Sequence, residues 1–510
     1  MSSPNFAAAR AWFGLYGLPG FLGSCFMSLG SLGVGWFPLS ANVLRLPIVD
    51  YLQTSTLGLA LTRSFVVVGA ALLLQSWLVI GVDTLHEKTV SLRTLYVTMA
   101  IWISPLLFSA PLFSRDVYSY YMQGRLQVDG HNPYESGVSL VPGWFTSGVD
   151  PMWADAKTPY GPVFLLIEKS VAQLVPNSPL VAAYVFRGIS ILGIIGIAWC
   201  VPRLARHHGI NPVAASWLAV LNPLVIMHLV VGAHNESLMI ALSCLALLWA
   251  SEKRFFLATC AATVALGIKP VAIVVLPFVA LLASTHSSTR ARMASFTKVG
   301  GVAGIALIAL SWVAHVGPLG WLNALSSPGT VRSWISPTTA MGMLSGLVLQ
   351  LFGVTNQIDH TIAFFRVMGA LTLGVVLVAL VMWPTRRTAT RSVAYSFLAL
   401  VVLGPVVQPW YLLWSIPLLA VTGLSHQQMR YMMLVICAFT IHGVANSSAT
   451  ADTFIEFSDG LAMLLAAGTL SLAMFASPRE RKLILGDEGI TGLDPRALTS
   501  QNQNTPLGMS

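Results

Sequence analysis

The residues best suited to acid–base chemistry gather in one polar segment, residues 114–162, which directly follows an apolar run, residues 95–113. Charged and aromatic side chains alternate there: Arg115, Asp116, Arg125, Asp129, Glu135, Asp150, Asp155 and Lys157 with Tyr118, Tyr120, Tyr121, Trp144, Trp153 and Tyr160. Asp116 stands just beyond the apolar run, where a carboxylate could act as a general base toward a hydroxyl group. Aspartate is also a favoured helix N-cap, so its position alone leaves catalysis and capping as alternatives.

Lys269 is the only Lys, Arg, Asp or Glu between positions 255 and 289, and it precedes a proline within an apolar run. A charge inside a membrane span costs about 3 kcal/mol on insertion scales, and its default interpretation is functional. An ammonium group at this depth could hold a lipid phosphate as a point charge. The alternative is that the side chain extends along its apolar stem to place the charge at the membrane surface.

His234, Asn235 and Glu236 form a short polar motif between two apolar runs, residues 213–231 and 236–250. Glu236 could bind a hydroxyl group of an acceptor, with His234 beside it, or it could cap the helix that follows. The spacing favours capping, and both roles are compatible.

Two further motifs combine aromatic and polar residues. Arg332, with Trp334 nearby, could bind phosphate oxygens through its planar fork of N–H groups, or form a salt bridge within a loop. Gln408, Trp410 and Tyr411 could line a binding cavity, or anchor the chain at the membrane surface as aromatic residues commonly do.

The composition defines the environment in which these residues work. The 510 residues are 55% hydrophobic and 9% charged, and the mean hydropathy is +0.74. A soluble domain carries about 25% charged residues, so a soluble protein is excluded. The five cysteines all lie in apolar segments without a CxxC pair, which indicates small packing residues rather than a disulfide framework.

The positive net charge of +9 reflects membrane topology rather than nucleic-acid binding. Most Lys and Arg residues fall in the N-terminus, the C-terminal tail and one alternate set of short loops. Short loops rich in Lys and Arg remain in the cytoplasm. We therefore expect a multi-pass protein of the plasma membrane with both termini cytoplasmic and residues 114–162 on the outer face.

Apolar runs predict an all-α polytopic membrane protein with about 13–14 transmembrane or re-entrant helices. The candidate spans are 12–36, 64–82, 95–113, 178–201, 213–231, 236–250, 256–268, 270–284, 299–317, 361–383, 392–407, 409–424, 429–448 and 457–476. Lys269-Pro270 and Gln408-Pro409 separate adjacent short runs and are predicted to be hinges. Non-helical backbone at this depth is tolerated only around a protein-lined or water-filled cavity, so both hinges are expected to line one. Residues 341–354 are too few to span easily and favour an interfacial or re-entrant helix.

Several kinds of chemistry lack their motifs. The sequence contains no His, Cys and carboxylate spacing typical of zinc, no glycine-rich phosphate loop and no GxSxG motif. We therefore predict no metal site and no cofactor, with a divalent cation kept as an alternative, and no nucleic-acid partner.

Taken together, the motifs RDVYSYYMQGRLQVDGHNPYESG, TPYGP, GAHNES, GIKP, SSPGTVRSWISPTTAMG and QPWYLLW resemble those of the actinobacterial polyprenol-phosphate-mannose-dependent α-(1→6)-mannopyranosyltransferases, which have the GT-C fold. The resemblance covers about residues 95–425. It implies a catalytic carboxylate in the first large outer loop, which falls on Asp116, and an active site that faces outward. It also implies a polyprenyl-phosphate mannose donor and a lipid-anchored mannoside acceptor.

The chain departs from the GT-C pattern in two respects. The large loop follows the third predicted span instead of the first, so residues 1–94 are interpreted as an added helix pair. Asp116 has no second acid within three positions, which argues against a bound metal. The remaining divisions are a central membrane module, residues 95–317, a C-terminal half, residues 318–476, with an outer loop at 318–355, and a cytoplasmic tail, residues 477–510.

The resulting hypothesis is an inverting mannosyltransferase that builds the α-(1→6) mannan of lipomannan and lipoarabinomannan. Asp116 is the predicted base, and Lys269 and Arg332 are the predicted phosphate contacts. The remaining candidate substrate contacts are Arg115, Tyr118, Tyr121, His234, Glu236, Trp334, Gln408, Trp410 and Tyr411. The alternatives are a GT-C arabinosyl- or glucosyltransferase that uses another polyprenyl-phosphate sugar, and a transporter of lipid-linked sugars.

Overall fold

The computed structural model describes residues 12–86, 90–284, 288–324, 329, 332–383 and 388–446. Within these residues the secondary structure is helical, and no strand occurs among them. Four helices in this part of the chain are long and apolar enough to cross a membrane: α4 (Thr56–His86), α8 (Pro179–His207), α13 (Thr289–Val313) and α16 (Ile358–Met382). The protein is therefore an all-α membrane protein, as the composition predicts.

Shorter apolar helices complete the bundle and pack against the long ones. They are α2 (Leu18–Val34), α5 (Leu92–Ile103), α9 (Pro212–Ala219), α10 (Glu236–Ser251), α11 (Phe255–Ile268), α12 (Leu276–Ala283), α17 (Ala389–Leu403), α18 (Ile416–Thr422) and α19 (His426–Asn446). The last candidate span, residues 457–476, lies outside the described residues.

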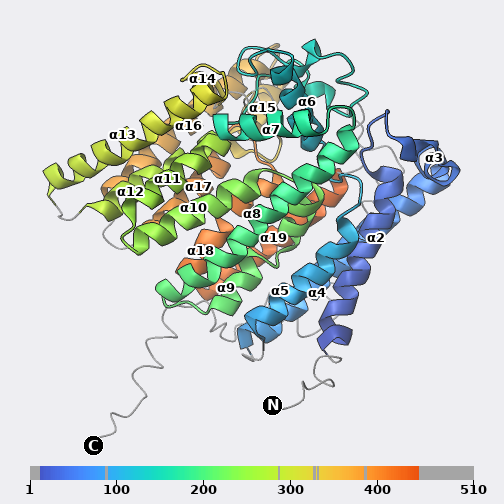
Figure 1. Cartoon of the computed structure of the whole chain (residues 1–510), viewed down its shortest axis with the longest axis horizontal. Coiled ribbons are helices and arrows are strands. Elements are labelled where there is room, and N and C mark those ends of the chain that lie inside the picture. Colours follow the sequence, from blue (N-terminus) through green and yellow to red (C-terminus); the bar gives the residue numbers. More distant parts are fainter. Residues whose placement is uncertain are drawn as a thin grey trace, which may run out of the picture.

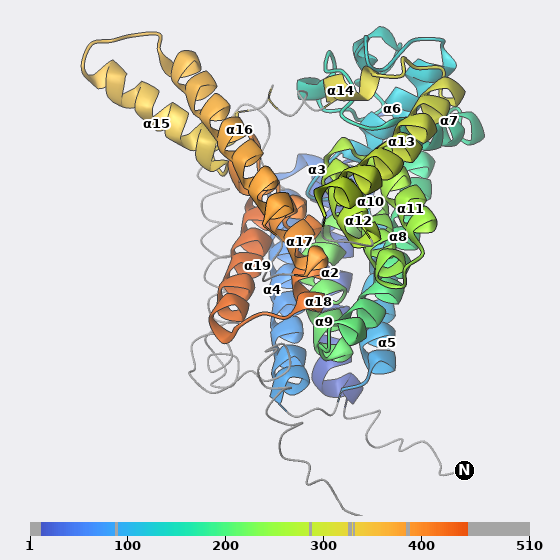
Figure 2. The same cartoon turned by 90° about the vertical axis from the view of Figure 1, so that its left-hand side faces the viewer.

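A polar layer covers one end of this bundle. It consists of α6 (Asp116–Val128), α7 (Pro162–Leu174) and the loop between them, and Figures 1 and 2 place it at the end of the molecule opposite α9. Helices α6 and α7 cross at Gly124, where a Cβ atom would lie 2.1 Å from the carbonyl oxygen of Glu168. Only glycine permits this close approach, so α6 packs directly against the backbone of α7.

The C-terminal half contributes a helical hairpin. Helix α15 (Pro337–Leu351) packs against α16, with Gly342 and Gly346 against Ile362 and Ile358, and Figure 2 shows the hairpin projecting away from the rest of the bundle. A short helix, α14 (Gly320–Ala324), precedes it beside the polar layer. The 341–354 segment is thus the greater part of a helix that pairs with α16.

The predicted span 95–113 is wrong in its second half. Helix α5 continues only as a short turn, η3 (Ser104–Leu106), and Leu107 to Arg115 are not regular helix. The carbonyl groups that the helix would have paired accept bonds from the buried Arg187 of α8 instead. Its Nη1 donates to Leu106, Leu107 and Ser109 at 2.7–3.1 Å, and its Nε and Nη2 donate to Val230 and Val231. Irregular backbone is stable at membrane depth only when its polar groups are satisfied in this way.

The predicted span 213–231 is also broken. Helix α9 ends at Ala219, and a second piece, η6 (Val225–Val231), begins after Asn222, whose side chain bonds the carbonyl of Leu218 and the N–H of Leu224. Piece η6 then meets α10 at an angle of 113°.

Both predicted hinges are confirmed. Lys269 has extended backbone (φ −138°, ψ 120°) between α11 and the short helix η7 (Pro270–Val275). Gln408 has a similar conformation (φ −122°, ψ 149°) between α17 and η9 (Pro409–Trp414). In each case the proline begins the second piece, because its fixed φ suits the first position of a helix.

Candidate active site

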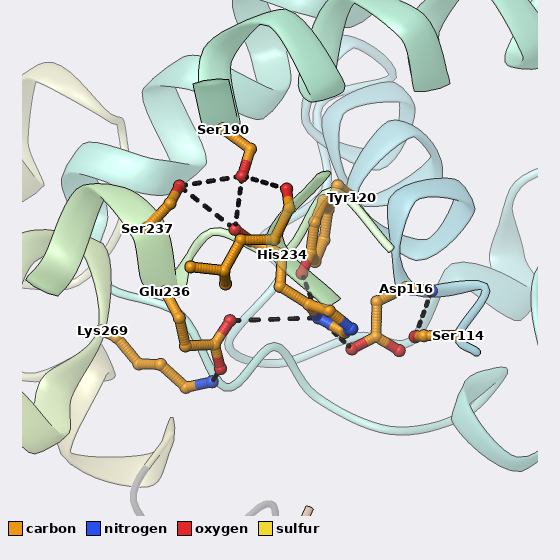
Figure 3. A network of polar contacts seen from close by, with 9 residues as sticks. Ser114, Asp116, Tyr120, Ser190, His234, Glu236, Ser237 and Lys269 are labelled. Atoms are coloured by element: carbon orange, nitrogen blue, oxygen red, sulfur yellow. Dashed lines mark hydrogen bonds and ion pairs between the residues drawn. The ribbon is translucent and has the colours of Figure 1, made fainter. Parts of the chain in front are cut away.

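Four elements bring titratable side chains together beneath the polar layer. These are the first turn of α6, the bend between η6 and α10, the hinge between α11 and η7, and the short helix η9. Figure 3 shows the resulting chain of contacts, which runs from Asp116 through His234 and Glu236 to Lys269. Gly161 joins the outer loop to this hinge, since its N–H donates to the carbonyl of Ile268 at 3.0 Å.

Asp116 is the first residue of α6, but it does not cap the helix. The N-cap is Arg115, whose side chain makes no capping bond, and the N–H of Asp116 itself donates to Ser114 Oγ at 3.1 Å. The Asp116 carboxylate instead faces His234, with Oδ2 3.5 Å from Nδ1, and a quarter of the side chain remains exposed. The capping alternative is therefore wrong, and the carboxylate is partly exposed.

Burial controls the protonation of Asp116. The desolvation of its carboxyl group, with a smaller contribution from the negative charge of Glu236, raises its pKa to about 6, although Lys269 and Ser114 act in the opposite direction. A carboxylate with such a pKa is ionised at neutral pH but holds a proton more strongly than an ordinary aspartate. This is the property that general-base catalysis requires.

His234 is buried at the centre of the group. Its Nδ1 lies 3.5 Å from Asp116 Oδ2, 3.5 Å from the Tyr120 hydroxyl and 3.9 Å from Glu236 Oε2. Its ring stacks on Trp410 of η9, with centroids 3.8 Å apart and planes inclined by 22°. The helix that follows the second predicted hinge therefore contributes the ring of Trp410 to the site.

Glu236 and Lys269 form a buried ion pair. Glu236 is the first residue of α10 and its side chain is 1% exposed, whereas that of Lys269 is 11% exposed. The Lys269 ammonium also lies 5.0–5.9 Å from the ring centroids of Tyr160, Tyr411 and Trp414, within range of cation–π attraction. The ammonium is thus enclosed by partners, so the alternative that it extends to the membrane surface is wrong.

Three predicted substrate contacts bond other parts of the protein. Tyr118 and Tyr121 are buried, and their hydroxyl groups donate to the carbonyls of Trp36 and Pro176 at 2.6 and 2.7 Å. Arg115 pairs with Asp150 at 3.1 Å and lies 4.2 Å from the Trp36 ring centroid. Neither tyrosine offers a ring face for a sugar, because both rings are packed inside the polar layer.

Arg332 and Trp334 were also predicted to contact substrate. Arg332 is exposed and pairs with Asp359 of α16, and Trp334 is 55% exposed. The loop salt bridge, which the sequence left as the alternative for Arg332, is the contact that the structure contains. Gln408 marks the hinge itself, and Trp410 and Tyr411 project from the helix that follows it.

Tyr120, Tyr160 and Trp414 belong to the site but were not among the predicted site residues. Tyr120 and Tyr160 stand in the polar segment beside other aromatic residues, and nothing in their spacing separates them from the packed Tyr118 and Tyr121. Trp414 lies in the QPWYLLW motif, one helical turn after Tyr411. The hinge motifs were the signal that could have found it.

No three His, Cys, Asp or Glu side chains within the described ranges gather closely enough to hold a metal ion.

Comparison with known proteins defines the class and then the family. Residues 17–285 match the family described as "Alpha-(1->6)-mannopyranosyltransferase, N-terminal domain", and residues 338–477 match the one described as "MptB C-terminal domain". A fold of buried apolar helices with these matches defines a membrane glycosyltransferase. No solved structure matches the chain significantly.

Curated relatives agree over most of the chain. A probable α-(1→6)-mannopyranosyltransferase of Mycolicibacterium smegmatis is 31% identical over 495 residues, covering 89% of this chain and 86% of the relative. The α-(1→6)-mannopyranosyltransferase A of Mycobacterium tuberculosis is 33% identical, covering 79% of each chain. The α-(1→6)-mannopyranosyltransferase B of Corynebacterium glutamicum is 29% identical, covering 89% and 78%. The chain belongs to the α-(1→6)-mannopyranosyltransferase family and is a mannosyltransferase.

Proposed function

We propose that this protein transfers mannose from polyprenyl-phosphate mannose to a lipid-anchored mannoside at the outer face of the plasma membrane. The product is the α-(1→6) mannan of lipomannan and lipoarabinomannan. The observation that carries the proposal is the state of Asp116. Its carboxylate is partly exposed, has a raised pKa and lies beside the buried ionisable residues of the site. Family membership supports the transferred sugar and the linkage.

The reaction is a single displacement at the anomeric carbon. Asp116 takes the proton of the acceptor 6-hydroxyl group while the acceptor oxygen bonds to that carbon. The bond from the carbon to the phosphate oxygen breaks, and the polyprenyl phosphate leaves with the electron pair. One base and a stabilised leaving group suffice, and no covalent sugar–enzyme intermediate is needed when the configuration inverts.

Lys269 is the proposed contact for the donor phosphate. Its ammonium group has three N–H donors, and the carboxylate of Glu236 does not require all of them. Since Glu236 offsets the charge, the phosphate meets a pair that is neutral overall. We therefore assign Lys269 to orienting the phosphate by hydrogen bonds more than to attracting it over a distance.

The orientation in the membrane follows from the distribution of basic residues. Arg203 and Arg206 lie in the last two turns of α8, which leads into α9, and Figure 1 places α9 at the end opposite α6. Loops rich in Lys and Arg face the cytoplasm. The polar layer and Asp116 are accordingly assigned to the outer face.

Purified protein supplied with polyprenyl-phosphate mannose and a short α-mannoside tests the proposal. We expect an extended mannoside with a new α-(1→6) linkage, and none with Asp116→Asn. Parallel reactions with polyprenyl-phosphate arabinose and glucose test the related donors. Transport of an intact lipid-linked sugar without transfer, or transfer from one of the other donors only, would contradict the proposal.

A further inference from the structure

The side chains of the site differ sharply in accessibility. Asp116 is 25% exposed, whereas the side chains of His234 and Glu236 are each 1% exposed. A substrate hydroxyl group can reach Asp116 but cannot touch His234 or Glu236 in this arrangement. The sequence-based prediction that these two residues bind substrate is therefore replaced by a role that acts through Asp116 and Lys269.

The surroundings of His234 define which ring nitrogen carries the proton. Nδ1 faces the oxygens of two carboxylates, Asp116 at 3.5 Å and Glu236 at 3.9 Å, and the Tyr120 hydroxyl at 3.5 Å, which can accept a hydrogen bond as well as donate one. A carboxylate oxygen accepts hydrogen bonds and donates none, so an unprotonated Nδ1 would face two acceptors with a lone pair of its own. The neighbours therefore favour the tautomer with a proton on Nδ1.

We propose that His234 is the positioning residue of this active site, and that its Nδ1–H holds the Asp116 carboxylate in the orientation and charge state of a base. The inference rests on the proposed role of Asp116. A hydrogen bond to the charged form of a carboxyl group favours that form. Nδ1 and the Asp116 oxygen lie 3.5 Å apart, and catalytic hydrogen bonds commonly tighten once a substrate is bound.

The imidazole is fixed from several sides. Trp410 stacks on one face, and the Ser190 hydroxyl lies 3.1 Å from the carbonyl oxygen of His234 and 2.9 Å from Ser237 Oγ (Figure 3). Ala233 has a positive φ of 52°, which a non-glycine residue rarely adopts. A ring held by stacking and by its own backbone loses little freedom when it bonds Asp116, as positioning requires.

The pH dependence of this pair involves every ionisable group that faces it. They are Asp116 and Tyr120 from α6, Asp150 and Tyr160 from the outer loop, His228 from η6, Glu236 from α10, Lys269 from the hinge and Tyr411 from η9. The carboxylates of Glu236 and Asp150 oppose ionisation of Asp116, and Lys269 favours it. Removing the Nδ1–H donor takes away one further contribution that favours the ionised base.

Two substitutions separate this role from simple packing. His234→Asn keeps an N–H donor near the position of Nδ1 but loses the ring, while His234→Phe keeps a ring to stack on Trp410 and loses the donor. We expect His234→Phe to reduce kcat/KM at pH 7 about 10- to 100-fold, the effect of losing a hydrogen bond to a charged group. His234→Asn should retain most of the activity, and the acceptor KM should stay near the wild-type value in both.

The pH profile provides the decisive measurement. The acid limb of kcat/KM should move to higher pH in His234→Phe, so that raising the pH recovers part of the activity, and it should move less in His234→Asn. An unchanged acid limb in His234→Phe, or His234→Asn as impaired as His234→Phe, would overturn the proposal. A merely structural loss lowers the rate at every pH without moving the limb.

A second variant leaves His234 itself intact. Ser190 is buried and reaches His234 only through main-chain and Ser237 contacts, so Ser190→Ala should lower kcat a few-fold and move the acid limb in the same direction. A wild-type rate and profile in this variant would count against the proposal even if the His234 variants failed to fold. If Asp116→Asn stays active, the proposed base is wrong. If Asp116→Asn is inactive while the His234 variants match wild type, only the positioning role is wrong.

Discussion

Replacing Lys269 by methionine tests the buried ion pair. Glu236 has a side chain only 1% exposed, and Lys269→Met would leave its carboxylate inside the protein without a cation. Removing one partner of a buried pair typically costs about 3–5 kcal/mol, since the remaining charge loses its compensation. We therefore expect Lys269→Met to lower the free energy of unfolding by roughly this amount.

The double variant Lys269→Met/Glu236→Gln should recover most of the lost stability, because the charge that was left unpaired is also removed. Thermal unfolding of the detergent-solubilised protein, followed by size-exclusion chromatography, measures the effect. The matched control is Lys157→Met in the outer loop, where an exposed lysine is removed and stability should change by less than about 0.5 kcal/mol. A midpoint for Lys269→Met equal to that of the control would refute the reasoning.

The same double variant tests the proposed phosphate contact without the stability defect. If Lys269 orients the donor phosphate, the double variant should have a raised donor KM and a nearly unchanged acceptor KM. Unchanged kinetics for the donor in a folded double variant would remove Lys269 from the proposed mechanism.

Four further outcomes are expected. Because the pKa of Asp116 is raised to about 6, kcat/KM should fall about tenfold per pH unit below this value, and a flat profile down to pH 5 would contradict the assignment. Asp116→Asn should reduce transfer by about 10²–10⁴. Because the folded protein raises the pKa of Asp116, ionisation of this residue destabilises the fold progressively between about pH 4 and 6. Asp116→Asn removes that ionisation, so at pH 7 its free energy of unfolding should equal that of wild type or exceed it by up to about 3 kcal/mol. In a cysteine-free background, Leu140→Cys should react with a membrane-impermeant thiol reagent in intact cells and Arg290→Cys should not, and the reverse pattern would invert the proposed orientation.

The parts of the fold that follow from local patterns could be predicted from the sequence. Long apolar runs predicted a bundle of membrane helices. A proline directly after a polar residue inside such a run predicted the hinges at Lys269 and Gln408. Asp116 became the candidate base because a carboxylate directly beyond an apolar run is unusual, and the structure shows it beside His234.

The long-range contacts could not be predicted, because they depend on how the helices pack. Lys269 looked like an isolated charge in the sequence, because its partner Glu236 lies 33 positions away. The stack of Trp410 on His234 brings the helix after the second hinge against the bend between η6 and α10, which is far away in the sequence. The tyrosines were misassigned for a related reason: alternating aromatic residues are equally compatible with packing and with sugar binding, and Tyr118 and Tyr121 are packed.

Arg187 has a consequence for how the site behaves when the protein moves. Its guanidinium group bonds the segment that leads into Asp116 and also the end of η6, which leads into His234. The segments that lead into Asp116 and His234 are thus both bonded to the same side chain of α8. We therefore expect these two segments to move together when the surrounding helices shift, so that side-chain rotation alone changes the gap between the carboxylate and the imidazole. Lysine could not replace this support, since a single ammonium has three N–H donors where the guanidinium has five.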